Sequence, residues 1–420
     1  MIKSLKLTNF RGFKDHVVEF SPFSLLIGQN NAGKTTIIEA LRILSVVQAR
    51  VANANFMMAP GEFVDYFTGP VFRFGLDTLD FDETNIHYLY QDEKPAQISL
   101  RYKNNCIINV YLGAEKADKY CQYLAPAGKK VNNRSAALNP KFSRVFVMPP
   151  IGSLLSSETE RNLKYLYKNI NGYLSYRHIR NQMFEMPHQF ALFRERLEAT
   201  WDHLKVEDIV PGQGELKNEY HLNLRDGTYP AEVARLGSGL QAWIQTLWFL
   251  ARVDDDAIVI LDEPDVYLHA DLQKKLIRVL GSMDHRQTIV ATHSIEMISD
   301  VSPDEIIEVR KRESRSRPIS SAVQVQAVLN QMGTSHHLQL SKLGHTGIVL
   351  FVEGKDHALL GKVANKLGDV FSKSFETVPK FPIGGMGNWQ RAAMTAKVLS
   401  GTSGTVRSVL VIDRDYFGDD

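Results

Sequence analysis

The most constraining feature of the sequence is the octet G-x-x-x-x-G-K-T at Gly28–Thr35. It follows a short apolar stretch, Phe23–Ile27, that is typical of a buried strand, and it precedes apolar residues at helical spacing over Thr35–Val47. A strand, a glycine loop and a helix in this order surround an anion with backbone N–H groups and a helix N-terminus. The octet therefore predicts an α/β fold with a phosphate-binding loop between a strand and a helix.

Two further strand ends carry polar residues that suit nucleotide hydrolysis. Asp262 and Glu263 follow the apolar run Ala257–Leu261; the first can enter a Mg²⁺ shell and the second can accept a proton from the attacking water. His293 follows the strand expected at Gln287–Ala291, and we interpret it as a γ-phosphate sensor. Lys34 would bridge the β- and γ-phosphates and Thr35 would ligate Mg²⁺. The ATP-binding residues predicted in the loop and helix start are Asn30, Asn31, Gly33, Lys34, Thr35 and Thr36.

A second α/β pattern occupies the C-terminal part of the sequence. The apolar strand Ile348–Val352 is followed by Glu353, and the strand Ser408–Ile412 is followed by Asp413 and Asp415. Carboxylates at the ends of parallel strands converge at one edge of a sheet, where they can hold Mg²⁺ or Mn²⁺. Such ions polarise a phosphodiester and stabilise the leaving oxygen. The pattern predicts a metal site for phosphodiester chemistry, although solvated acidic pairs of this kind are common.

The remaining segments complete the expected organisation. Residues 157–205 predict a helical hairpin that protrudes from the core, and Ala231–Arg252 predicts one helix. The expected regions are an ATPase N-terminal lobe over 1–60, an insertion with strands and a helical dimerisation element over 61–215, an ATPase C-terminal lobe over 216–310, a linker over 311–345 and a second α/β domain over 346–420.

Charge and hydropathy limit where the protein acts. Lys and Arg number 49 and Asp and Glu 47, a net charge of +2, so contact with nucleic acid has to come from local patches. Arg310–Arg317 is such a patch, interpreted either as a solvated linker or as a contact to a phosphate backbone. The N-terminus shows no secretory signal and no apolar run suits a membrane span. We therefore expect a cytoplasmic protein without a membrane partner.

Two sequence motifs resemble those of a known ATPase group. Asn9-Phe10-Arg11-Gly12 follows the first strand, and Leu236-Gly237-Ser238-Gly239-Leu240-Gln241 precedes the strand that ends at Asp262. Together with the octet they resemble the ABC-type ATPase heads of the SMC, Rad50 and RecF group. In such heads the Ser-Gly signature of one subunit covers the nucleotide bound by the other. The resemblance implies that Ser238 and Gly239 contact ATP across a head-to-tail dimer.

The C-terminal pattern resembles a Toprim domain, with E-G at Glu353, G-G-x-G-N at Gly384–Asn388 and D-x-D at Asp413. An ABC-type head followed by Toprim resembles the OLD (overcoming lysogenization defect) family of nucleases, which occurs in bacterial anti-phage defence, including Gabija-type and some retron systems. The resemblance implies an ATP-controlled, metal-dependent DNA endonuclease with Glu353, Asp413 and Asp415 as metal ligands. The partners it implies are DNA, a second copy in a homodimer or higher even oligomer, and a defence-system protein or retron nucleic acid.

Two departures from the family pattern leave a second function open. The position four after Glu353, often acidic in the family, is His357, and the sequence stops five residues after Asp415, where a Toprim domain would continue. We therefore expect either a truncated Toprim domain or a defective nuclease half. The alternative function is an ATP-dependent switch or scaffold whose Toprim region recruits DNA or a partner effector without cutting.

Overall fold

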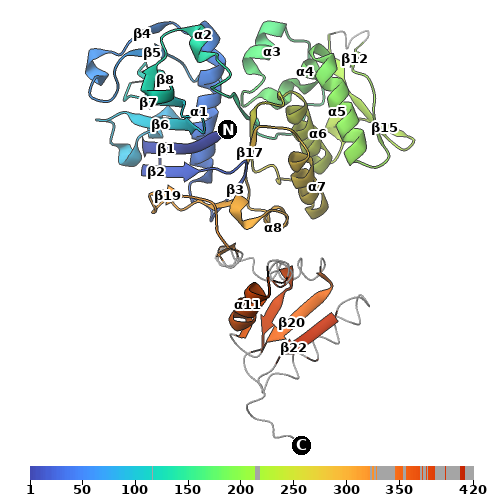
Figure 1. The fold of residues 1–420 in the computed structure, drawn as a ribbon. Helices are drawn as coiled ribbons and strands as arrows, with labels where there is room; N and C mark the ends of the chain where they lie inside the picture. Colours follow the sequence, from blue (N-terminus) through green and yellow to red (C-terminus); the bar gives the residue numbers. More distant parts are fainter. Residues whose placement is uncertain are drawn as a thin grey trace, which may run out of the picture. The chain divides into compact units, whose positions relative to one another are not determined.

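The computed structural model describes residues 1–115, 117–212, 218–321, 324–325, 328, 346–352, 356–368, 371, 375, 377–383, 393 and 407–411. The chain forms two compact units, Met1–Ser320 and Ser321–Asp420 (Figure 1). The linker expected over 311–345 thus begins inside the first unit. None of the helices described is long and apolar enough to cross a bilayer.

A nine-stranded sheet forms one side of the first unit. At the N-terminus β1 (Ile2–Phe10) pairs antiparallel with β2 (Phe13–Glu19) in a hairpin, and β6 (Ala96–Tyr102) pairs with the other edge of β1. Strands from the expected insertion thus extend the sheet of the hairpin. The other members are β4 (Phe56–Met58), β5 (Pro70–Arg73), β7 (Ile107–Leu112), β8 (Lys119–Ala125), β9 (Lys129–Lys130) and β19 (Arg315–Ser316).

A five-stranded parallel sheet forms the centre of the unit, in the order β10-β16-β17-β3-β18. Asp262 at the end of β16 is the register partner of Ala291 at the end of β17, and Ala291 in turn pairs with Leu26 of β3. The three strand ends therefore meet at one edge, where ligands bind in open α/β sheets. The strands are β3 (Phe23–Ile27), β10 (Val145–Val147), β16 (Ile258–Asp262), β17 (Gln287–Ala291) and β18 (Ile306–Glu308).

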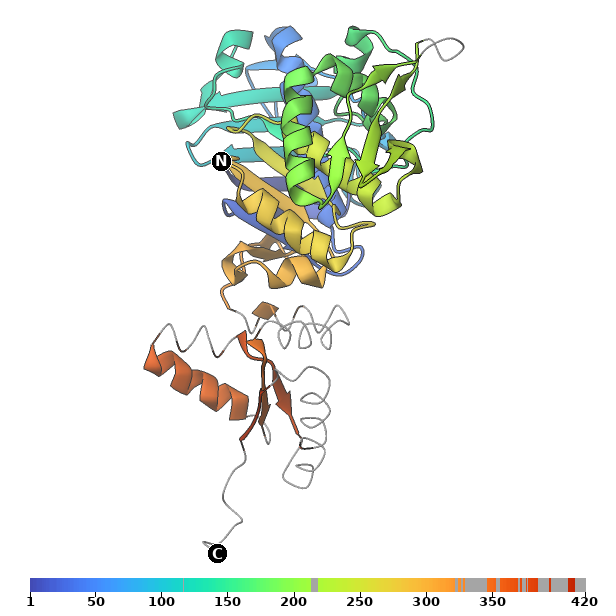
Figure 2. The ribbon, with the colours of Figure 1, turned by 90° about the vertical axis from the view of Figure 1, so that its right-hand side faces the viewer.

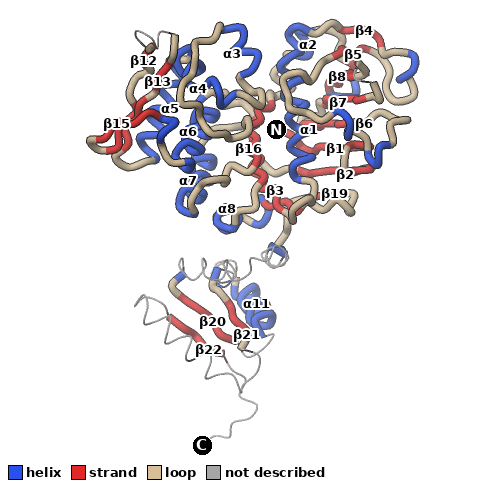
Figure 3. Tube along the Cα trace, turned by 180° about the vertical axis from the view of Figure 1, so that it is seen from behind, coloured by secondary structure: helices blue, strands red, loops and turns tan. Residues whose placement is uncertain are grey.

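Helix α1 (Lys34–Arg50) lies between the two sheets, as Figures 1 and 3 show. It confirms the helix predicted over Thr35–Val47 and extends it at both ends. Its apolar residues, such as Ile37 and Leu41, share one buried cluster with Leu5 of the nine-stranded sheet and Ile260 of the parallel sheet. A helix buried on both sides is held in one rotation about its axis, which fixes where its first residues point.

The helical part of the first unit does not protrude as predicted. Within it, α5 (Pro187–Thr200) packs against α6 (Ser238–Ala251) (Figure 2). Phe193 and Leu197 are fully buried, and the rings of Phe193 and Trp248 lie 6.1 Å apart. Burial of this apolar face against α6 is more favourable than its exposure on an extended hairpin. The helices are α2 (Arg134–Ala137), α3 (Leu163–Asn169), α4 (Ile179–Glu185), α5 (Pro187–Thr200), α6 (Ser238–Ala251), α7 (Ala270–Gly281) and α8 (Ile295–Ser299).

The helix predicted over Ala231–Arg252 is wrong at its start, because α6 begins only at Ser238. Residues before it form β15 (Tyr229–Glu232) and a short turn. The side-chain amide of Gln241 donates to the carbonyl oxygens of Ala234 and Leu236, so these groups are satisfied without a longer helix. The smaller strands are β11 (Leu204–Val206), β12 (Val210–Pro211), β13 (Tyr220–His221) and β14 (Asn223–Asp226), with β14 between β11 and β15 in one sheet and β12 paired with β13 in another.

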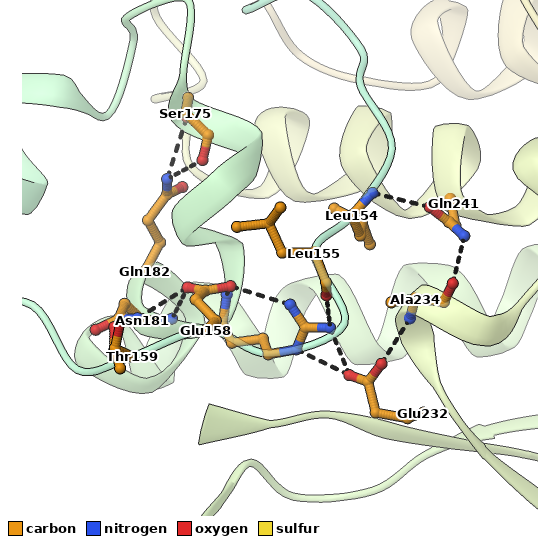
Figure 4. Close-up of polar contacts among 11 residues, drawn as sticks. Leu154, Leu155, Glu158, Thr159, Ser175, Asn181, Gln182, Glu232, Ala234 and Gln241 are labelled. Atoms are coloured by element: carbon orange, nitrogen blue, oxygen red, sulfur yellow. Dashed lines mark hydrogen bonds and ion pairs between the residues drawn. The ribbon is translucent and has the colours of Figure 1, made fainter. Parts of the chain in front are cut away.

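A buried arginine connects α4 to the strand that precedes α6 (Figure 4). Arg180, with no exposed surface, donates from Nη1 to Glu158 (3.1 Å) and from Nε to Glu232 (2.8 Å). Glu158 also accepts from the backbone and side-chain N–H groups of Asn181 at 2.8 and 2.9 Å. Burial raises the pKa of Glu158, and these donors oppose that change. The network holds the segment before α6 to the helical region.

The second unit contains a parallel sheet in the order β21-β20-β22. Its strands are β20 (Ile348–Val352), β21 (Lys380–Pro382) and β22 (Arg407–Val411), with α11 (Asp356–Leu367) after β20. The first predicted strand is confirmed, and the strand predicted at Ser408–Ile412 lies one residue earlier. Val352 and Val411, the last residues of β20 and β22, are register partners.

The Arg180 network generates a prediction on stability. Arg180→Met should lower the free energy of unfolding of the first unit by about 3–5 kcal/mol, because Glu158 is then buried without its cation. Arg225→Met, which breaks an ion pair whose arginine is 53% exposed, is the matched control and should cost less than about 1 kcal/mol. Urea-induced unfolding followed by tryptophan fluorescence measures both. Equal losses for the two variants would contradict the assignment.

Candidate nucleotide site

The predicted phosphate loop joins β3 to α1 and requires glycine at both ends. Gly28 and Gly33 have φ angles of +154° and +110°. A Cβ atom on Gly28 would lie 2.9 Å from the carbonyl oxygen of Val309, and one on Gly33 would lie 2.5 Å from Cζ of Phe13. The first turn of α1 carries no acidic residue, so its positive end is free to face an anion. The loop therefore has the backbone form of a phosphate cradle.

Lys34 lies at the centre of the candidate site and is 5% exposed. Its Nζ donates to the carbonyl oxygen of Gly28 at 3.1 Å and lies 2.7 Å from Nε2 of His293. The same Nε2 lies 3.7 Å from Oε1 of Glu263. Burial lowers the pKa of Lys34, and burial together with Lys34 lowers the pKa of His293, which favours a neutral ring that accepts from the ammonium group. The structure thus brings Lys34, His293 and Glu263 together.

The two acids after β16 lie at the same edge. Burial raises the pKa of Asp262 to about 6, and Arg42 of α1, whose Nη2 lies 3.9 Å from Asp262 Oδ2, opposes this. Glu263 has a φ of +46°, a sparsely populated region for a residue with a side chain, and its N–H donates to Ala291 at 2.8 Å. The strained backbone of Glu263 is therefore held by a hydrogen bond to the neighbouring strand.

Sequence reasoning missed two members of this cluster. Arg42 lies two turns along α1 from Lys34, and no motif marks it. Asp265 accepts a 2.6 Å hydrogen bond from Thr292 Oγ1, which itself accepts from the N–H of Ser294 at 2.9 Å, and burial raises the pKa of Asp265. The acid three residues after Asp262 could have been singled out, since it follows the same strand end. Together these contacts fix the turn that carries His293.

The other predicted residues lie in two places. Asn30, Asn31 and Thr35 are exposed along the loop and helix start, and Thr36 is half-buried. Ser238 and Gly239 begin α6, which lies on the opposite side of the parallel sheet from α1 (Figures 1 and 3). Ser238 is exposed, and a Cβ atom on Gly239 would lie 2.9 Å from the carbonyl oxygen of Tyr267.

The chemistry of these residues fits ATP and Mg²⁺. The loop offers N–H groups and an ammonium group to phosphates, while the Thr35 hydroxyl and the Asp262 carboxylate are the oxygen ligands that Mg²⁺ prefers. Among the described residues, no cluster of three or more His, Cys, Asp or Glu side chains is arranged to hold a metal ion. Glu353, Asp413 and Asp415 lie outside the described residues.

The chain is similar to one curated nuclease and, more distantly, to two solved structures. A curated OLD nuclease of Thermus scotoductus is 25% identical over 362 residues, which cover 77% of this chain and 64% of that nuclease. This match confirms the resemblance to OLD nucleases, and the chain spans less than two thirds of that relative's length. Among solved structures, an Smc head bound to the C-winged helix domain of ScpA has a TM-score of 0.47 at 16% identity, covering 76% of this chain and 98% of its own. The recombination mediator RecF has a TM-score of 0.46 at 13% identity, with the same coverages of 76% and 98%.

The expected α/β ATPase head is confirmed by a family match that contains the whole candidate site. Residues 23–299 include the phosphate loop, the acids after β16 and His293. They match the family described as "AAA domain, putative AbiEii toxin, Type IV TA system", and the chain therefore belongs to that family.

Proposed function

We propose that this protein is an ATP-controlled, divalent-metal-dependent DNA endonuclease of the OLD type that acts in bacterial anti-phage defence in the cytoplasm. The observation that carries the proposal is the contact of Lys34 with His293, 2.7 Å apart beside the phosphate loop, with Glu263 within 3.7 Å of the same imidazole nitrogen. A cation, a neutral acceptor and a carboxylate at the edge of a parallel sheet suit phosphoryl transfer to water.

The chain's own residues have defined tasks in ATP hydrolysis. Lys34 exchanges its contacts with Gly28 and His293 for contacts with phosphate oxygens. Burial of Lys34 strengthens the attraction between its ammonium group and these oxygens, because the local dielectric is low. His293, released from Lys34, donates a hydrogen bond from its ring N–H to an oxygen of the terminal phosphate. Glu263 accepts the proton of the attacking water. Thr35 and Asp262 would hold Mg²⁺, which would neutralise the charge that develops on the phosphates.

The nuclease part of the proposal rests on the second unit. Its strands β20 and β22 are parallel neighbours, and their last residues Val352 and Val411 are partners. The chain continues from Val352 directly to Glu353, and from Val411 it reaches Asp413 after one residue. Carboxylates that follow paired parallel strands meet at one sheet edge, which supports a shared site for Mg²⁺ or Mn²⁺. The sequence similarity to a curated OLD nuclease supports the same reaction class.

We also propose that ATP joins two copies of the chain through Ser238 and Gly239, giving a homodimer or a higher even oligomer. Ser238 is exposed at the first position of α6. The N–H groups of the first turn of a helix have no partner within the helix, so they can contact a phosphate of the ATP bound by another subunit. Gly239 is closely packed on the carbonyl of Tyr267, which holds this helix start in place.

The ATPase assignment predicts different defects in ATP binding and turnover for two variants. Lys34→Ala should abolish ATP binding, because the buried ammonium group is lost from the cradle. Glu263→Gln should bind ATP with the parent affinity and reduce turnover at least about 100-fold, since an amide cannot accept the proton. Calorimetric titration and phosphate release measure binding and turnover. Equal turnover in the parent and Glu263→Gln would refute the role of Glu263.

The dimer assignment predicts that Glu263→Gln doubles its mass in light scattering when Mg²⁺ and ATP are added. Adding Ser238→Arg should prevent this change, because the larger side chain blocks the helix start, while calorimetry still detects ATP binding to the monomer. Arg235→Met, at an exposed residue just before the signature, is the control and should dimerise. A monomer in every condition would rule the proposal out.

The nuclease assignment predicts that Asp413→Asn removes metal-dependent nicking of plasmid DNA while ATP hydrolysis stays within about twofold of the parent, because the two sites belong to separate units. The full natural protein is assayed with Mg²⁺ or Mn²⁺ and with EDTA. Nicking that survives in Asp413→Asn would place the chemistry elsewhere. A parent that hydrolyses ATP and binds DNA without nicking would favour the alternative, a switch or scaffold that recruits DNA or a partner effector.

A further inference from the structure

A basic side chain from the segment after β18 lies on the phosphate loop. Nζ of Lys311 donates to the side-chain oxygen of Asn31 at 2.5 Å, although the two residues are 280 positions apart. A Cβ atom on Gly12 would lie 3.3 Å from Cε of Lys311, and one on Gly33 would lie 3.4 Å from its Cγ. The aliphatic part of Lys311 therefore crosses both glycines, and its ammonium group ends at the rim of the candidate ATP site.

The charge of Lys311 is not balanced locally. Within the same basic stretch Arg310 pairs with Glu308 and Glu313, whereas Lys311 has no acidic partner among the residues that the structure describes. Its hydrogen-bond acceptor is a neutral amide. Lys311 is half-buried as a residue, and its ammonium group lies beside a loop built for phosphates with a neutral partner that it can leave. Such a group is suited to a charge-assisted contact with a nucleotide phosphate.

The segment that carries Lys311 is anchored on both sides. Before it, the N–H of Val309 donates to Ile27, the last residue of β3, at 2.9 Å. After it, the fully buried His16 has its Nδ1 2.7 Å from the carbonyl oxygen of Glu313 and its Nε2 3.0 Å from Oγ of Ser316. The first unit ends at Ser320. Lys311 thus lies between the end of the phosphate-loop strand and the last residues before the second unit.

We propose that Lys311 is a second cation for the nucleotide: when ATP binds, the ammonium group of Lys311 leaves Asn31 and contacts a phosphate of ATP. The movement of Lys311 thereby transmits occupancy of the site to residues 312–320. The proposal rests on the proposed function, because it requires ATP at the loop, and it adds the start of a route by which ATP controls the second unit. Neither the linker nor the DNA-contact interpretation of the basic stretch includes this role.

Binding of ATP to variants of the Glu263→Gln parent tests the contact without turnover. Lys311→Met, which keeps the length of the stem and loses the charge, should weaken ATP binding about tenfold in calorimetric titration. Lys311→Arg should restore the affinity to within about twofold. Arg312→Met, at the exposed neighbouring residue, is the matched control and should bind as the parent does. Equal affinity in Lys311→Met and the parent would overturn the proposal.

Hydrogen exchange of the backbone amides tests the transmission. In the parent and in Arg312→Met, saturating ATP should slow exchange in residues 312–320, and in Lys311→Met this change should be absent at saturation while exchange in the phosphate loop still slows. The same change in Lys311→Met as in the parent would overturn the transmission step. If the Glu263→Gln protein itself does not bind ATP, the proposed function is overturned together with this inference. If it does bind ATP, a negative result for Lys311→Met overturns only the role of Lys311.

Discussion

Burial of α1 between the two sheets is the constraint on which the nucleotide site depends. Ile37, Leu41 and Leu44 have no exposed surface, and each such side chain contributes roughly 1.5–3 kcal/mol by leaving water. Rotation of the helix would expose these residues on one side and overpack them on the other. Lys34, the first residue of α1, is therefore held beside the ends of β16 and β17 by the core rather than by its own polar contacts.

The same packing explains the charges at the site. Lys34 is buried among carbonyl oxygens and His293, and its lowered pKa reflects burial that Glu263 and Asp262 only partly oppose. Around it the pKa values of Asp262 and Asp265 are raised by burial. A site with desolvated carboxylates facing a desolvated ammonium group gains from a ligand that brings both phosphates and a divalent cation. The phosphate loop and the acids after β16 therefore suit the two parts of one ligand, the phosphates and the divalent cation.

The sequence allowed prediction where one short stretch determines the structure. An apolar strand followed by glycines or acids gives a signal within a few consecutive residues. The sequence therefore predicts the loop before Lys34, the acids Asp262 and Glu263, and the strand that begins at Ile348. Contacts between distant residues left no such signal: Arg180 reaches Glu158 and Glu232 across 22 and 52 positions. The prediction that α6 begins at Ala231 is wrong, because the side-chain amide of Gln241 donates to the carbonyl oxygens of Ala234 and Leu236. In a longer helix backbone N–H groups would donate to these oxygens. The ligands expected at Glu353, Asp413 and Asp415 stay predictions.

The position of β18 explains why the end of the first unit and the phosphate loop are physically connected. β18 pairs in parallel with β3, and its last residue, Glu308, is the register partner of Ile27, which directly precedes Gly28. The chain after Glu308 therefore runs beside the loop, so closely that Val309 excludes any side chain from Gly28. Because β19 then pairs in parallel with β2 of the nine-stranded sheet, the segment between β18 and β19 spans both sheets. A change in the loop has a short, packed path to this segment, and the path exists because two parallel strands end together.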